Sequence, residues 1–344
     1  MVRRSLIAAA LVAIASPLAA QSTPPGPAEW TWATNRPDTN APMGVFGART
    51  LGESEFELAY RYVQMNSRGV WFDSDSLALA TTLQLYNDAP LTLSDIRHQV
   101  SISYGVSENL TLLARGEFAV LERETIANGS LLRTGAEEFG DLEVAALYNV
   151  YSQGPYRLHI MAGAVLPVGT MTTYADTTMA QTGVLVAQPF DMRPSSGSVG
   201  GTLGITGVAQ NEFGSVGAQF RLRTNFNESS AGTTLGDRYE ANGWAAYNLN
   251  HSFSASGGFR WESWDNVEGV DTRINPAGDP MNLGALLAGQ RLVLPVGLNF
   301  LMPEGARFSG HRLSLEAVYT LHQDLEGPQL GFDWGLNFGW SVAR

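Results

Sequence analysis

The chain has 344 residues, a formal net charge of −12 and no cysteine. The surplus of 33 acidic over 21 basic residues argues against nucleic-acid binding, because phosphates would be repelled. Without cysteine, no disulfide holds the fold together, so its stability has to come from packing or from a hydrogen-bonded ladder.

The N-terminus has the pattern of a secretory signal peptide. Arg3 and Arg4 precede an apolar run, and small residues follow up to Ala20. This pattern predicts a signal peptide over residues 1–20, cleaved after Ala20, because the apolar run is too short to span a bilayer. Loss of the two arginines would leave 19 basic against 33 acidic residues, hence a charge of −14. Residues 21–52, rich in Pro, Asn and Thr, predict an extended periplasmic leader.

From Ser54 onward, apolar and polar residues alternate with a period of two, which is the period of a β-strand. In the first such segment, Leu58 and Tyr60 alternate with Glu57 and Arg61. The pattern recurs about twelve times, in segments near the ten-residue length that a tilted membrane strand needs. The barrel is therefore expected over residues 53–344.

The connections between these segments alternate between long and short. Long connections on one side and short turns on the other are typical of bacterial outer-membrane barrels. Leu77–Tyr86, inside the first long connection, is expected either to fold inward or to lie on the rim. The long connections include Met65–Arg97, Glu122–Gly140 and Gly169–Gly197, and Val106–Asn109 is a tight turn.

The polar face of each segment is expected to point into the barrel. About twelve tilted strands give a backbone diameter of about 24 Å, which is too wide for a dry core. An arginine that faces lipid at the bilayer midplane costs about 2–4 kcal/mol. The residues expected to line the pore are Arg115, Glu117, Arg157, His159, Arg221, Arg223, Glu240, Arg260, Glu262, Arg291, Arg312 and Glu316.

The chain closes on a strand with one large apolar face. In "DWGLNFGW", Trp334, Leu336, Phe338 and Trp340 alternate with smaller or polar residues. The segment resembles the C-terminal assembly signal of outer-membrane barrels, although four further residues follow it. The residues that match this signal are Asp333, Gly335, Phe338 and Trp340.

The segment Asn40–Trp71, "NAPMGVFGARTLGESEFELAYRYVQMNSRGVW", carries a wider resemblance. It resembles the opening of outer-membrane transporters grouped with the phenol-degradation pathway (MetA-type) proteins. The resemblance implies an outer-membrane channel of roughly twelve strands, for small organic or aromatic compounds, and it carries over no catalytic residue. The matching residues are Ala41, Pro42, Met43, Gly44, Val45, Tyr60, Arg61 and Tyr62.

Together these patterns predict an all-β protein, a closed antiparallel transmembrane β-barrel with long extracellular loops and short periplasmic turns. The expected function is a porin-like channel or transporter for small solutes in the outer membrane of a Gram-negative bacterium. The expected partners are outer-membrane lipid, the barrel assembly machinery and a small-molecule solute, with no nucleic acid, cofactor or metal.

Two alternatives to transport stay open. The long loops could serve as a recognition surface on a barrel that transports nothing. A hydrolase built into the wall would need a nucleophile beside a base. His159 and His322 fit inward positions, and Ser103 or Ser314 could be their neighbours, but no catalytic motif surrounds them. The sequence therefore predicts no enzyme.

Overall fold

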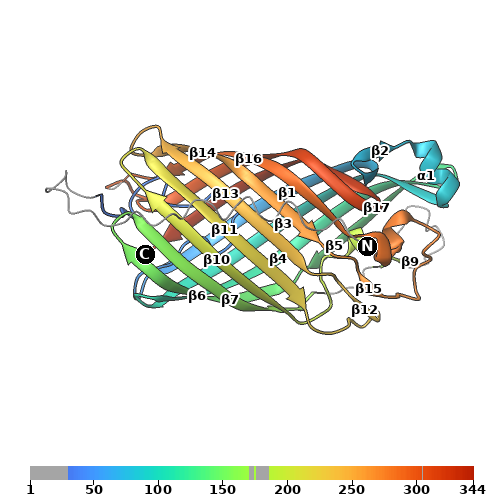
Figure 1. Ribbon diagram of the computed structural model, residues 1–344, viewed down its shortest axis with the longest axis horizontal. Helices are drawn as coiled ribbons and strands as arrows, with labels where there is room; N and C mark the ends of the chain where they lie inside the picture. The colour runs from blue at the N-terminus through green and yellow to red at the C-terminus, as the bar shows by residue number, and fades with distance from the viewer. Residues whose placement is uncertain (1–29, 170–173, 176–185, 304) are drawn as a thin grey trace, which may run out of the picture.

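The alternating segments form the strands of one closed antiparallel barrel, seen from the side in Figure 1. The computed structural model describes residues 30–169, 174–175, 186–303 and 305–344. The predicted signal peptide, residues 1–20, lies outside the described residues, as does the first part of the predicted leader.

The wall is one 13-stranded sheet in which neighbours along the chain are mostly neighbours in space. Short strands, one α-helix and 3-10 turns occupy the connections at one end (Figure 1). The strands of the sheet are β1 (Phe56–Asp73), β2 (Asp75–Leu77), β3 (Asp88–Ser107), β4 (Leu110–Ala127), β5 (Ser130–Phe139), β6 (Leu142–Gln153), β7 (Tyr156–Leu166), β10 (Gly200–Gln210), β11 (Gly214–Asn225), β13 (Arg238–Asn248), β14 (Phe253–Trp264), β16 (Gly289–Leu301) and β17 (His311–Ala343). The remaining elements are α1 (Leu79–Leu85), β8 (Tyr174–Ala175), β9 (Val186–Ala187), η1 (Phe190–Met192), β12 (Thr233–Thr234), β15 (Glu268–Gly269), η2 (Pro280–Asn282) and η3 (Gly284–Leu286).

Strand β17 closes the barrel by turning back on itself. Its part from Arg312 to Leu325 pairs with β16, and its part from Leu325 to Ala343 returns along β1, both antiparallel. Eleven strands form the ring, with β2 and β5 as extensions, and β17 counts twice, so the described chain crosses the wall twelve times. Closure leaves no unpaired edge in lipid. The predicted fold class is confirmed.

The strands run further than the sequence indicated on one side of the barrel. Strands β1 and β3 continue through most of the expected Met65–Arg97 loop, which shrinks to residues 74–87. The expected loop Glu122–Gly140 is instead a β-hairpin of β4 and β5, with Asn128 and Gly129 at φ 50° and 76° in its turn. Helix α1 lies at the outer rim and is largely exposed. The strands thus continue into segments expected to be loops, which the sequence alone could not separate from the wall.

The outer face is apolar, and the closing strand follows this pattern with one interruption. Trp334 and Phe338 are each 41% exposed, whereas Asn337 between them is buried. At Asp333 the register with β1 shifts, so that Phe332 and not Asp333 takes the buried inner position. Phe332 packs there against Val293 and Val318. Within the described residues, no helix has the length and hydropathy needed to cross a membrane.

We predict that Phe338→Ala combined with Trp340→Ala lowers the amount of folded protein in the membrane severalfold. The change removes apolar area from the lipid-facing side of the closing strand, together with the hydrogen bond from Trp340 Nε1 to His311 Nδ1 (3.0 Å). The measurement is the heat-modifiable band on an SDS gel. Phe213→Ala with Phe308→Ala is the matched control, since both side chains are exposed in short turns. Equal yields of the two double variants would contradict the prediction.

Candidate functional site

The residues that precede β1 lie inside the barrel. We call Trp30–Gly52 the plug segment; it has no regular secondary structure. It starts at the end of the barrel with the short turns, where the Trp32 amide donates to the carbonyl of Gly154 (3.1 Å). It leaves at the same end, where the amide of Leu51 donates to Thr111 Oγ1 (2.8 Å). The sequence predicted an extended leader here but did not place it in the lumen.

Phe46 anchors the plug segment in the lumen. Its ring contacts two guanidinium groups, with the Cζ atoms of Arg115 and Arg221 at 3.9 and 4.6 Å from the ring centroid. Both guanidiniums bind the carboxylate of Glu143, at 2.8 Å from Arg115 and 2.5 Å from Arg221. Each arginine therefore makes a charged hydrogen bond and a cation–π contact, which fixes the ring in place.

Backbone carbonyls of the plug segment are bound by side chains of the wall. His159, which is 2% exposed, donates from Nε2 to the carbonyl of Gly47 (2.8 Å). Gln219 Nε2 donates to the carbonyl of Phe46 (2.8 Å). Near the short turns, Arg312 donates to the carbonyls of residues 34 and 36 (2.9 and 2.8 Å). A segment without its own ladder thus has its buried carbonyls satisfied by the barrel.

Two glycines allow the plug segment and the wall to approach closely. A Cβ atom on Gly44 would lie 1.3 Å from Nη2 of Arg260, in β14. A Cβ atom on Gly339, in β17, would lie 1.9 Å from Cε of Met43. In both cases the end of a long side chain occupies the space that a Cβ atom would take.

Further charges line the interior beyond Phe46. Arg97 binds Glu117 (2.6 Å), Arg291 binds Glu262 (2.5 Å), and Arg223 binds Asp141. Arg223 and Asp141 lie on β11 and beside β6, which are separated in the sheet by β10 and β7, so the pair reaches over the inner face of these two strands. A contact over intervening strands requires that both side chains point inward.

The sequence-predicted residues differ in their partners. Arg221 and Glu240 are partners in the β11–β13 register, yet Glu240 accepts from Asn242 Nδ2 (2.6 Å) and Arg221 binds Glu143. His322 is exposed after a register shift and lies away from the interior positions of its strand. Arg115, Arg157, His159, Arg221, Arg260 and Arg312 lie against the plug segment. Glu117, Arg223, Glu262, Arg291 and Glu316 join ion pairs of the wall.

Several central residues were not among the predicted site residues. Glu143 shares the inward parity of β6, so alternation was a signal for its direction but not for its two arginine partners. Asp141 lies at the break between β5 and β6, where no alternation was visible. Phe46 lies in a segment that no periodic pattern marks. Its neighbours come from strands far along the chain, and sequence spacing does not report such contacts.

The opposite end of the barrel carries a cap made of two long connections. Arg123, in β4, binds Asp191 (3.1 Å) of one connection and Asp279 (2.7 Å) of the other. Arg193 binds Asp271 (2.9 Å), which again joins the two connections. The apolar contacts of the cap come from Val267, Met281 and Leu287, with Phe190 and Leu235 packed against them.

Two carboxylates of the cap, Asp191 and Asp271, have pKa values shifted in opposite directions. Desolvation raises the pKa of Asp191 to about 6, and Asp279 adds to this effect, while Arg123 opposes it. Hydrogen bonds from Arg273 lower the pKa of Asp271 to about 2. One acidic group of the cap therefore titrates near neutral pH while the other stays ionised.

The fold is similar to that of a known outer-membrane channel, at low sequence identity. The structure of the COG4313 outer membrane channel from Pseudomonas putida F1 is similar with a TM-score of 0.59 and 12% identity, covering 88% of this chain and 100% of that chain. The Pseudomonas putida toluene transporter TodX is less similar, with a TM-score of 0.40 and 12% identity over 92% of this chain and 95% of that chain. No family model and no curated protein sequence matches the chain. The first of these likenesses establishes the barrel fold, and the MetA-type resemblance stays unconfirmed.

We predict that Glu143→Gln lowers the free energy of unfolding by about 2–3 kcal/mol, since it weakens two charged hydrogen bonds and leaves two guanidiniums facing each other. Equilibrium unfolding in guanidinium chloride, followed by tryptophan fluorescence, measures the change. Glu122→Gln is the matched control on an exposed carboxylate of β4. An equal loss in both variants would mean that the Glu143 bridge carries no special stability.

We predict that the cap opens less often at pH 5 than at pH 7. Because Asp191 has a pKa of about 6 in the closed cap and close to 3.9 once solvated, the closed cap holds the proton more tightly. Its stability therefore rises as pH falls through 6 and is lost as pH rises. Hydrogen exchange of the amides of residues 188–193, corrected for intrinsic rates, measures opening. Asp191→Asn should abolish the pH dependence and the exposed Glu228→Gln should keep it; the reverse pattern would refute the assignment.

Proposed function

We propose that this protein is a channel of the Gram-negative outer membrane through which small solutes pass. The observation that carries the proposal is a closed transmembrane barrel whose interior is lined by charged side chains and occupied by a segment without secondary structure. A barrel that served only as an anchor would have no need of a wide polar interior. The likeness to an outer-membrane channel supports the same conclusion.

The plug segment would control passage. It enters the lumen as far as Phe46, and side chains of the wall hold it through hydrogen bonds, one ion pair and contacts of arginines with its aromatic rings. No strand pairing has to break for it to move. The residues proposed to line the path beside and beyond it are those that the sequence predicted on the polar faces, together with Asp141 and Glu143.

Two other functions receive less support. The ring of His159 is engaged by a backbone carbonyl, and in the described part of the chain no serine or carboxylate binds it, so its arrangement is unlike a catalytic dyad. The cap could form a recognition surface on the outside of the cell. Its buried ion pairs and apolar cluster, however, fit a structure that covers the mouth of the barrel as well.

We predict that removal of the plug raises the single-channel conductance severalfold. Residues 34–48 would be replaced by a glycine–serine linker of equal length, which keeps Trp32 and Leu51 at their anchors. Planar-bilayer recordings compare this variant with the unchanged protein. The same kind of replacement over α1, which lies on the rim, is the control and should leave conductance unchanged. A plugless barrel that conducts no ions would overturn the channel assignment in favour of surface recognition.

A further inference from the structure

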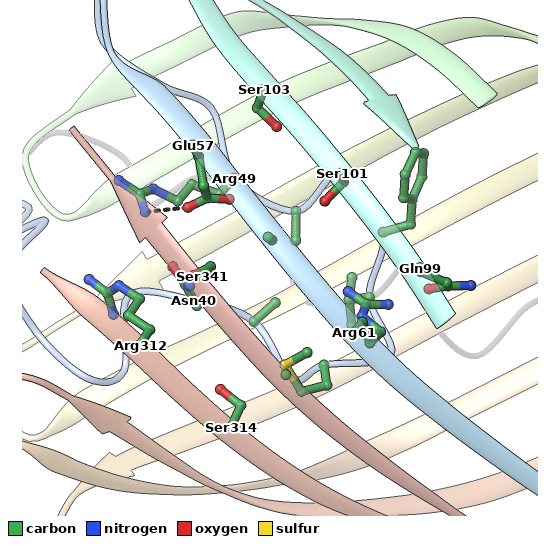
Figure 2. Close-up of a pocket in the computed structure, with 18 of the residues that line it drawn as sticks. Asn40, Arg49, Glu57, Arg61, Gln99, Ser101, Ser103, Arg312, Ser314 and Ser341 are labelled. Atoms are coloured by element: carbon green, nitrogen blue, oxygen red, sulfur yellow. Dashed lines mark hydrogen bonds and ion pairs between the residues drawn. The ribbon is translucent and has the colours of Figure 1, made fainter. Parts of the chain in front are cut away.

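A cavity of about 120 Å³ lies between the plug segment and the inner face of β1, β3 and β17. Figure 2 shows its lining: Asn40 and Arg49 come from the plug segment, and Arg61 and Gln99 come from neighbouring strands of the wall. At one side, Arg49 and Glu57 form an ion pair (3.0 Å). The cavity is therefore bounded on one side by the segment proposed to control passage.

The lining of this cavity is strongly cationic. Four arginines contribute to it, against a single carboxylate, that of Glu57. Three of the four are already bound: Arg49 to Glu57, Arg115 to Glu143, and Arg312 to backbone carbonyls. Arg61 is the exception, because among the described residues it has no ion pair and no hydrogen bond.

The two carboxylates that act on Arg61 electrostatically form no ion pair with it in the described structure. Glu240 and Glu316 are both within electrostatic range of Arg61. Glu240 accepts a hydrogen bond from Asn242 (2.6 Å), and Glu316 accepts one from Asn337 (2.7 Å). An unpaired guanidinium inside a protein is costly unless water or an anion binds it. The geometry thus leaves one cationic position open for an anion.

The remaining lining favours an organic anion over an inorganic one. Hydroxyl groups and apolar side chains face the same space, so a ligand with a charged end and an apolar body would match both. A cavity of about 150 Å³ in another protein holds benzene, so this smaller and partly open cavity limits that body to one six-membered ring at most. The hydroxyls belong to Ser101, Ser103, Ser314 and Ser341, and the apolar side chains include Met43, Phe46 and Leu113.

We propose that this cavity binds a small organic monocarboxylate, with its carboxylate on Arg61 and its apolar body against Met43 and Phe46 of the plug segment. The proposal rests on the proposed channel function and names the class of solute. A bound molecule would touch the wall and the plug segment at once, and would therefore be held at the point where passage is controlled.

The test measures binding directly, by the ¹⁹F line width of 4-fluorobenzoate titrated with purified protein in detergent. 4-Fluorobenzamide and 4-fluorobenzylamine, which share the ring but lack the negative charge, serve as ligand controls, and inorganic phosphate serves as a competitor. We expect the benzoate to bind at least tenfold more tightly than the amide or the amine, and phosphate to compete weakly.

Two variants probe the cavity. Arg61→Gln should weaken benzoate binding at least tenfold, because a charged hydrogen-bond donor is lost. Arg68→Gln, the same change at an exposed position of β1, should not affect it. Ala59→Leu keeps Arg61 but fills the cavity, and should abolish binding even if the Arg61 variant fails to fold.

Benzoate binding that survives both Arg61→Gln and Ala59→Leu would overturn the proposal, as would equal binding of all three ring compounds. Displacement of benzoate by phosphate at equal concentration would assign an inorganic anion instead and overturn it too. The channel function is tested separately by conductance. If benzoate binding depends on Arg61 but the barrel does not conduct, the channel function is refuted and the binding site stands. If the barrel conducts but does not bind benzoate, the binding site is refuted and the channel function stands.

Discussion

The order of the interior depends on one ion-pair bridge, in which the carboxylate of Glu143 binds the guanidiniums of both Arg115 and Arg221. A ring of this width cannot be filled by the short side chains of its own wall. The bridge joins two cations of the wall, Arg115 on β4 and Arg221 on β11, and both guanidiniums lie against the ring of Phe46. Without the carboxylate the two cations would repel each other and the aromatic ring would lose both supports.

This arrangement shows how a wet interior can still be ordered. Each buried charge has only a few partners, and three of the ion pairs join parts of the wall that are not neighbours in the sheet. Hydrogen bonds from His159 and Gln219 to carbonyls replace the ladder that the plug segment lacks. The position of the plug segment in the lumen is therefore set mainly by polar contacts with the wall and by glycines that leave room for side chains.

The strands could be predicted because a wall with lipid outside and water inside imposes a period of two on every crossing. The ends of the strands could not be predicted, because β4 and β5 keep the same alternation through the expected loop Glu122–Gly140. The direction of Arg221 followed from its parity, but its partner did not, because Glu143 lies 78 positions away in the chain. Phe332 replaced Asp333 on the inner face through a bulge, which alternation alone cannot reveal. No periodic pattern in the sequence indicated that the plug segment would lie inside the barrel.

The plug segment enters and leaves the barrel at the same end, since Trp32 is bonded beside the β6–β7 turn and Leu51 beside the start of β4. It therefore forms a loop inserted into the barrel, and both of these anchors lie at the end through which it enters. A loop can be withdrawn and reinserted without threading a free end and without opening the seam between β1 and β17. The topology therefore allows β1 and β17 to pair before, during or after insertion of this loop. A loop that leaves the lumen can also return to the same position.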